Sequence, residues 1–194
     1  MTRSVQSHGL DETIDAMQRE FPGFRIVPKR DDRLSHVIDR ALRIVTLGGQ
    51  REYLTHYHTV LGETLYVPDG WDLIPDDHRV VTLRHELVHL RQSRRSGFPL
   101  FAFLSLVPIF PLGLAYGRAR IEWEAYEETV RATAEILGCD EAESPALRTR
   151  IVNQFTSAAY GWMWPFPRSV HRWYDEALEK IREELARPQG NLRS

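Results

Sequence analysis

The sequence predicts a helix-rich α+β fold, with one domain in which a small mixed sheet lies beside a central helix. Apolar residues recur at helical spacing in several long segments, of which 78–95 and 168–186 are examples. Short runs of alternating apolar and polar residues occur between 53 and 68. A chain of 194 residues, 42% hydrophobic and 27% charged, can bury a core of its own. We expect the domain to span 11–187, between flexible polar ends at 1–10 and 188–194.

Two helices and two or three strands are predicted before the central helix. We expect a helix over 11–20, which Phe21-Pro22-Gly23 ends, and a short strand over 24–27. A longer helix should run from about 31 to 47. The alternation between 53 and 68 then predicts two strands or one bent strand, with a turn near its middle.

The central helix is predicted from about 78 to 95, and Asp76-Asp77 offers its N-cap. One side of it carries an apolar stripe that should face the core. The stripe consists of Val80, Leu83, Leu87 and Leu90, whereas the other side carries Val81, His85, Val88, His89 and Gln92. Histidines on a helix with an apolar backing are what a buried metal site requires.

The second half of the chain begins with an unusual apolar segment, Phe98–Tyr116. Ser105 is its one polar side chain, and three prolines interrupt it. Three helices are predicted after it, over 119–137, 145–157 and 168–186, with Ser144-Pro145 starting the second.

Composition excludes some classes of function. The net charge of −2 gives no general electrostatic reason to bind nucleic acid. Cys139 is the one cysteine, so no intramolecular disulfide can form, and a reducing compartment is the simpler expectation. Residues 1–11 contain no apolar stretch of the kind found in secretory signals. We therefore expect a cytoplasmic protein.

The residues His85-Glu86-Leu87-Val88-His89 read H-E-x-x-H. Positions i and i+4 share one face of a helix, so both imidazoles can bind the same metal ion. Glu86 can then take a proton from a metal-bound water. The extended pattern with a third histidine needs glycine and histidine where this chain has Gln92 and Arg95, so that pattern is excluded. A third ligand should therefore come from the helix at 119–137, whose glutamates are Glu122, Glu124, Glu127, Glu128 and Glu135.

Together with this motif, the stretch Glu124-Ala125-Tyr126-Glu127-Glu128 resembles the gluzincin metallopeptidases, to which thermolysin belongs. The resemblance covers the two motif helices and not the whole chain. It implies a zincin-like fold, one Zn²⁺ ion, Glu124 as third ligand and Glu128 as the residue that orients a histidine. The family usually has aspartate where this chain has Glu128. Glu122 stays open as the alternative ligand, and a solvated acidic face beside Arg131 stays open for Glu124.

The function that follows is hydrolysis of a peptide bond in a peptide or protein substrate. Glu86 would act as general base, and Tyr160 or His171 would stabilise the oxyanion. Both are also ordinary residue types for an aromatic loop and a helix surface. We expect Gly62–Val67 to be an edge strand that pairs with the substrate. The alternative function is a non-catalytic zinc-binding regulatory or interaction module.

Three interpretations of Phe98–Tyr116 remain open: a lid or wall over the cleft, a dimer contact, or a hairpin in peripheral contact with a membrane. If His89 and Glu124 bind one ion, they lie on the same side of any membrane, so one complete span between them is excluded. Arginines on both flanks suit a loop that enters from the cytoplasmic face. The sequence does not indicate an oligomeric state.

Overall fold

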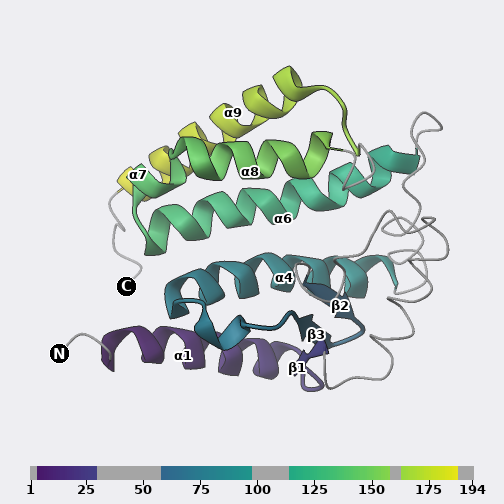
Figure 1. Cartoon of the computed structure of the whole chain (residues 1–194), viewed down its shortest axis with the longest axis vertical. Coiled ribbons are helices and arrows are strands. Elements are labelled where there is room, and N and C mark those ends of the chain that lie inside the picture. Colours follow the sequence, from purple (N-terminus) through teal and green to yellow (C-terminus); the bar gives the residue numbers. More distant parts are fainter. Residues whose placement is uncertain (1–3, 30–57, 98–113, 158–162, 188–194) are drawn as a thin grey trace, which may run out of the picture. The chain divides into compact units, whose positions relative to one another are not determined.

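The computed structural model of the protein describes residues 4–29, 58–97, 114–157 and 163–187 (Figure 1). The chain divides into two compact units, Met1–Phe98 and Pro99–Ser194. The boundary falls at the start of the apolar segment, inside the span predicted as one domain. Helices with a small sheet in the first unit confirm the α+β class.

The first unit contains the elements from the N-terminus to the central helix. They are α1 (Ser4–Glu20), β1 (Arg25–Pro28), β2 (Thr59–Leu61), β3 (Thr64–Val67), the 3-10 helix η2 (Trp71–Leu73) and α4 (Asp76–Ser96). Helix α1 starts at Ser4, seven residues before the helix predicted over 11–20, whereas the flexibility predicted for 1–10 stays a prediction. Buried Leu10 lies at helical spacing from buried Met17 and Phe21, so the packed face extends to an earlier turn. The helix predicted over 31–47 lies outside the described residues.

The sheet has the order β1-β3-β2 and is mixed, as predicted. Strand β1 pairs with β3 in parallel, whereas β2 and β3 form an antiparallel hairpin, in which Gly62 has a φ of 61°. All four residues of β3 are buried. The prediction that Gly62–Val67 is an edge strand is therefore wrong, because β3 has a neighbour on both sides, and β1 and β2 are the outer strands among the described residues.

Helix α4 packs against α1 and also contacts β2. It confirms the helix predicted over 78–95, but Pro75 is the N-cap residue, and Asp76-Asp77 lie in the first turn. Their negative charges there favour the helix N-terminus. Gly97, with a φ of 80°, follows the last residue of α4. The core of this unit is made by Met17, Phe21, Phe24, Leu65, Val67, Leu83 and Leu90.

The second unit consists of helices. They are α6 (Leu114–Ile136), the short α7 (Cys139–Ala142), α8 (Pro145–Thr156) and α9 (Pro167–Ala186). Figure 1 shows α6, α8 and α9 alongside one another, and α9 contacts both others. The three long helices confirm those predicted over 119–137, 145–157 and 168–186, whereas α7 was not predicted. The hydroxyl of Ser144 accepts a hydrogen bond from the backbone N–H of Leu147, as an N-cap should.

The apolar segment Phe98–Tyr116 lies mostly outside the described residues, and its last three residues form the first turn of α6. No helix in the described part of the chain has the length and apolar character needed to span a membrane. The interpretations of this segment as lid, dimer contact or membrane hairpin therefore stay predictions. The tail predicted over 188–194 also lies outside the described residues.

Candidate metal centre

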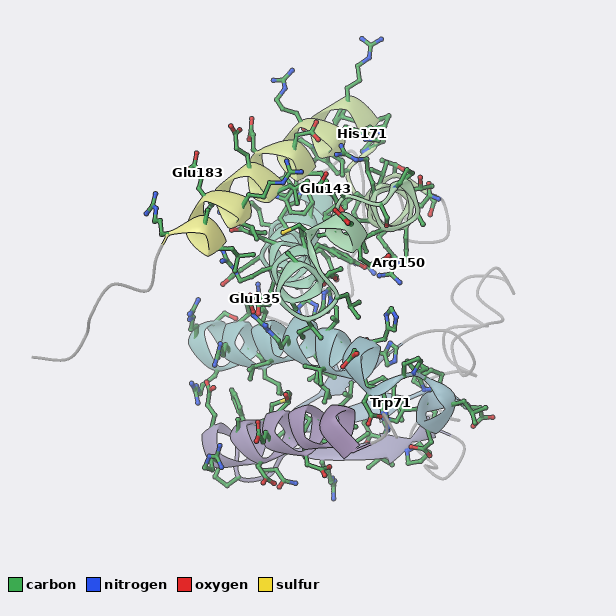
Figure 2. All side chains as sticks on the ribbon, turned by 90° about the vertical axis from the view of Figure 1, so that its left-hand side faces the viewer. Trp71, Glu135, Glu143, Arg150, His171 and Glu183 are labelled. Carbon is green, nitrogen blue, oxygen red and sulfur yellow. The ribbon has the colours of Figure 1, made fainter. Side chains whose placement is uncertain are left out.

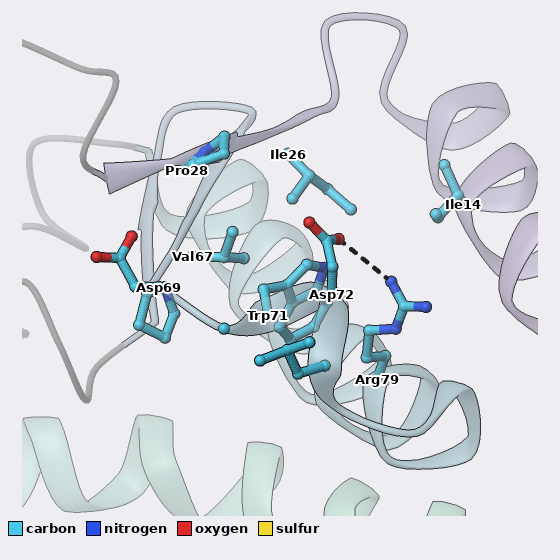
Figure 3. A pocket seen from close by; sticks show the side chains of 11 residues that line it. Ile14, Ile26, Pro28, Val67, Asp69, Trp71, Asp72 and Arg79 are labelled. Atoms are coloured by element: carbon cyan, nitrogen blue, oxygen red, sulfur yellow. Dashed lines mark ion pairs between the residues drawn. The ribbon is translucent and has the colours of Figure 1, made fainter.

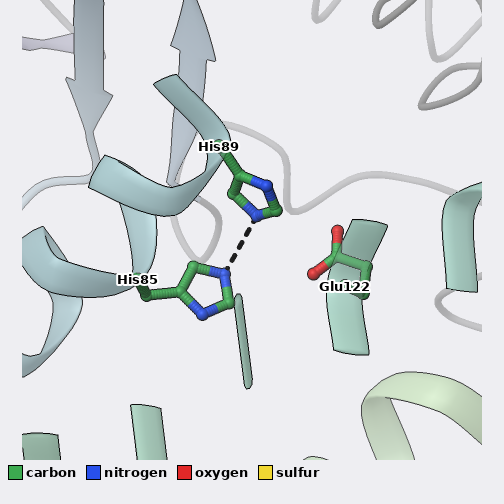
Figure 4. Close-up of side chains that lie close together, drawn as sticks. All are labelled: His85, His89 and Glu122. Atoms are coloured by element: carbon green, nitrogen blue, oxygen red, sulfur yellow. Dashed lines mark hydrogen bonds between the residues drawn. The ribbon is translucent and has the colours of Figure 1, made fainter. Parts of the chain in front are cut away.

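Helix α4 places His85 and His89 on one face, one turn apart (Figure 4). Their Nε2 atoms lie 3.1 Å apart, and their ring centroids are separated by 4.8 Å with an interplanar angle of 80°. Two nitrogens bound to one tetrahedral zinc would lie about 3.3 Å apart, since each Zn–N bond is about 2.0–2.1 Å. The pair therefore fits a metal of this size with little rearrangement.

His89 is held in one orientation from its other ring nitrogen. Its Nδ1–H donates to Oε1 of Gln92 over 3.0 Å, and both side chains are buried. A proton on Nδ1 leaves the lone pair on Nε2, which is the form that binds a metal. The same tautomer lets His89 Nε2 accept a hydrogen bond from His85 Nε2.

Glu86 lies between the two histidines in the sequence and is buried, with 7% of its surface exposed. On an α-helix it is turned about 100° from His85, so it borders the face that carries the imidazoles. If the two imidazoles held a metal ion, a carboxylate shielded from bulk water beside them would have the position of a general base.

The glutamates of α6 occupy different faces of the helix, and aromatic packing fixes how this helix is rotated within the second unit. Trp123 stacks on Phe155 with ring centroids 5.8 Å apart, and Tyr126 contacts the same ring edge-on at 5.5 Å. Glu122 and Glu124 are two positions apart and so point about 200° apart around the helix. Glu122 is half-buried, whereas Glu124 is exposed.

A second buried face of α6 lies apart from the one that packs against α8 and α9. Ala125, Thr129 and Thr133 are all buried and follow one another at helical spacing. The threonine hydroxyls donate to the carbonyls of Ala125 and Thr129 along the helix. Glu122 precedes Ala125 and Thr129 by three and seven residues, so it lies on this face.

Figure 4 draws Glu122 together with the two histidines. Two imidazoles and one carboxylate are a ligand set of catalytic zinc, so these three side chains have the chemistry to hold a metal ion. Glu122 belongs to the second unit, so its ligation to the same ion as His85 and His89 is a proposal. Glu124, the ligand that the resemblance implies, is exposed, and the choice between it and Glu122 stays a prediction.

Glu128, predicted to orient a histidine, has a cationic neighbour in its own unit. Its Oε2 lies 3.7 Å from Nε of Arg131. Neighbouring Glu127 accepts a hydrogen bond of 2.6 Å from Lys180. Gln92 already accepts the hydrogen bond of His89 Nδ1–H. The orienting role predicted for Glu128 can therefore concern only His85, and it stays a prediction. The role of Gln92 was not predicted, although its place three residues after His89 was a signal for it.

The two residues proposed from the sequence as oxyanion stabilisers gain no support. Tyr160 lies outside the described residues. His171 is exposed on α9 (Figure 2), next to Val170 of the buried stripe but not part of it. Their roles in catalysis stay predictions.

A separate cavity of about 480 Å³ lies in the first unit, between α1, the sheet and η2 (Figure 3). Ile14, Ile26 and Trp71 contribute to its apolar lining, and Arg79 to its polar part. Arg79 Nη1 lies 3.6 Å from a carboxylate oxygen of Asp72. None of the three motif residues lines this cavity, so it is not part of the candidate metal centre.

Comparisons of the chain with protein-family models, with curated proteins and with solved structures find no match.

Proposed function

We propose that the protein is a zinc-dependent metallopeptidase. The observation that carries this proposal is the arrangement on α4, where His85 and His89 present two nitrogens 3.1 Å apart with buried Glu86 between them in the sequence. A purely structural metal site needs no carboxylate in this position, because its ligands close the coordination sphere. A hydrolytic site needs one, since a proton must leave the attacking water.

The third protein ligand is Glu122 in this proposal. Its half-buried position on the second buried face of α6 supports it, whereas Glu124 is exposed. Zinc in this site would polarise the scissile carbonyl and activate a water. The Glu86 carboxylate would take the proton of that water and deliver it to the nitrogen of the leaving amine.

The edge of β2 that faces away from β3, with which no strand of the described residues pairs, is the proposed binding place for an extended peptide. Strand β2 pairs with β3 on one side, and it contacts α4, the helix that bears the histidines. A peptide that added to this edge would be held by backbone hydrogen bonds, with little demand on its sequence.

The test combines metal analysis with cleavage of a mixed library of fluorogenic peptides. The wild-type protein should contain about one zinc per chain and cleave members of the library. Glu86→Gln should keep the metal and lose activity by at least about 100-fold, because it removes the base and leaves the ligands. His89→Ala should lose both the bound metal and the peptidase activity.

Each other outcome rejects part of the proposal. A protein without metal affinity would show that the motif arose by chance. Zinc with four protein ligands in an X-ray absorption spectrum, together with no cleavage, would show a non-catalytic zinc module. Full activity of Glu86→Gln would remove this residue from the mechanism.

A further inference from the structure

Gln92 is a buried amide whose hydrogen-bonding partner is a proposed metal ligand. Its side chain accepts the Nδ1–H of His89 over 3.0 Å, and its exposed fraction is 9%. It lies three residues after His89, on the same face of α4, so the helix itself sets the distance between them. The contact therefore lies within one rigid element.

We propose that Gln92 is a positioning residue that selects the metal-binding tautomer of His89. This inference rests on the proposed function. An amide oxygen can only accept, so the contact requires the proton of a neutral imidazole to be on Nδ1. The lone pair is then on Nε2, the atom that faces His85. Without this acceptor, His89 could place its proton on Nε2 and would have to exchange tautomer before it bound an ion.

The chemistry of Gln92 also bears on the strength of the metal site. Ligating histidines commonly donate their second N–H to a carboxylate or a carbonyl, and a carboxylate makes the imidazole the more basic ligand. A neutral amide fixes the ring but transfers less negative charge to it. We therefore infer a site in which His89 is oriented while the metal keeps more of its Lewis acidity.

The experiment compares Gln92→Met with Gln92→Glu. Methionine preserves the length and burial of the side chain but removes the acceptor, whereas glutamate preserves the acceptor and adds charge. Exposed Gln18 on α1 offers a matched control, Gln18→Ala. Zinc affinity would be measured by competition with a chromophoric chelator. Nitrogen-15 NMR of the histidine rings in the zinc-free protein would report the tautomer of His89.

We expect Gln92→Met to weaken zinc binding by about 10- to 100-fold, the usual effect of losing the partner of a ligating histidine. Gln92→Glu should bind zinc at least as tightly as the wild type, and Gln18→Ala should bind it equally. The wild-type NMR spectrum should show His89 protonated at Nδ1, and this preference should be lost in Gln92→Met.

The inference is overturned if Gln92→Met binds zinc as tightly as the wild type, or if wild-type His89 carries its proton on Nε2. These outcomes leave the proposed peptidase untouched. Conversely, weakened zinc binding in Gln92→Met together with no peptide cleavage by the wild type would support the role of Gln92 and reject the peptidase. A wild type that binds no zinc would reject both.

Discussion

Glu20 at the end of α1 and Arg91 of α4 form a bidentate ion pair. Nε and Nη2 of Arg91 donate to the two carboxylate oxygens over 3.0 and 2.6 Å. Arg94, one turn along α4, donates to the same carboxylate over 2.9 Å, and its guanidinium lies 4.5 Å from the ring centroid of Phe21. The end of α1 is thereby fixed to the half of α4 that follows His89.

Replacing Glu20 by glutamine should lower the free energy of unfolding by about 1 kcal/mol at pH 7, a value suited to a partly exposed but bidentate pair. The hydrogen bond from Arg91 is the main cause that lowers the pKa of Glu20. A lowered pKa gives stability that is present above the ordinary pKa of glutamate and is lost as the pH falls through the folded-state value. The difference in the free energy of unfolding between wild type and Glu20→Gln, measured with urea, should therefore become smaller below pH 4.

Exposed Glu12 on α1 provides the control, because Glu12→Gln removes a carboxylate of the same helix from a position without this pair. It should leave the unfolding energy within about 0.5 kcal/mol of the wild type. An equal loss in both variants would mean that the ion pair with Arg91 contributes nothing specific.

The carboxylates of α6 provide a second test, now of the proposed ligand set. Glu122→Gln should weaken zinc binding by more than about 100-fold, since loss of a ligand exceeds loss of a ligand's partner. Glu124→Gln is the matched variant two residues away and should change the affinity little. Isothermal titration with zinc measures both. The reverse ranking would restore Glu124, the ligand that the resemblance implies.

Periodicity alone was enough to predict the long helices. Helix α4 and the helices of the second unit follow apolar stripes that sequence spacing reveals directly, and Ser144-Pro145 marked the start of α8 correctly. The identity of the edge strand was not accessible in this way. Which strand lies in the middle is decided by pairing between β1 and β3, whose residues are far apart in the sequence.

The candidate site was predictable to the extent that it lies on one helix. The spacing of His85 and His89 fixes their common face, and the 3.1 Å separation of their nitrogens agrees with it. The packing of Trp123 on Phe155 fixes the rotation of α6 within its own unit, and the choice between Glu122 and Glu124 as ligand stays a prediction. The resemblance to a family motif implies Glu124, whereas Glu122 is the more buried of the two carboxylates.

A third prediction concerns His58, which precedes β2. Its Nε2 is buried and has no hydrogen-bonding partner among the described residues, and its ring meets Trp71 edge-on at 5.2 Å. Burial, and then the charge of buried Lys29, lower its pKa to about 4. The unfolded chain binds a proton at this histidine near pH 6.5, whereas the folded protein does so only near pH 4. The folded state therefore loses stability relative to the unfolded chain as the pH falls from 6.5 towards 4.

At pH 5 this loss should amount to about 2 kcal/mol relative to pH 7.5. His58→Phe keeps an aromatic contact with Trp71 but cannot be protonated, so its unfolding energy should depend less on pH over this range. Urea titrations at the two pH values measure the difference. His171→Gln, at an exposed position of α9, should retain the wild-type dependence. If His58→Phe and the wild type lose equal stability, another group is responsible.

The last prediction concerns the buried hydroxyl of Tyr174 on α9. It donates to the carbonyl of Ala142 over 2.6 Å and so ties α9 to the end of α7. Tyr174→Phe should lower the free energy of unfolding by about 1–2 kcal/mol at pH 8, because the carbonyl loses its donor while the ring volume stays the same. Urea unfolding measures this value directly.

The pH dependence of the same variant distinguishes the hydroxyl from the ring. Burial raises the pKa of Tyr174 to about 12. A raised pKa gives stability that is complete below the ordinary tyrosine value near 10 and is lost as the pH rises towards 12, because the unfolded chain gives up its proton first. Between pH 8 and pH 11 the difference in the free energy of unfolding between wild type and Tyr174→Phe should therefore decrease by about 1 kcal/mol. A gap that stays constant would show that Tyr174 ionises as readily in the folded protein as in the unfolded chain.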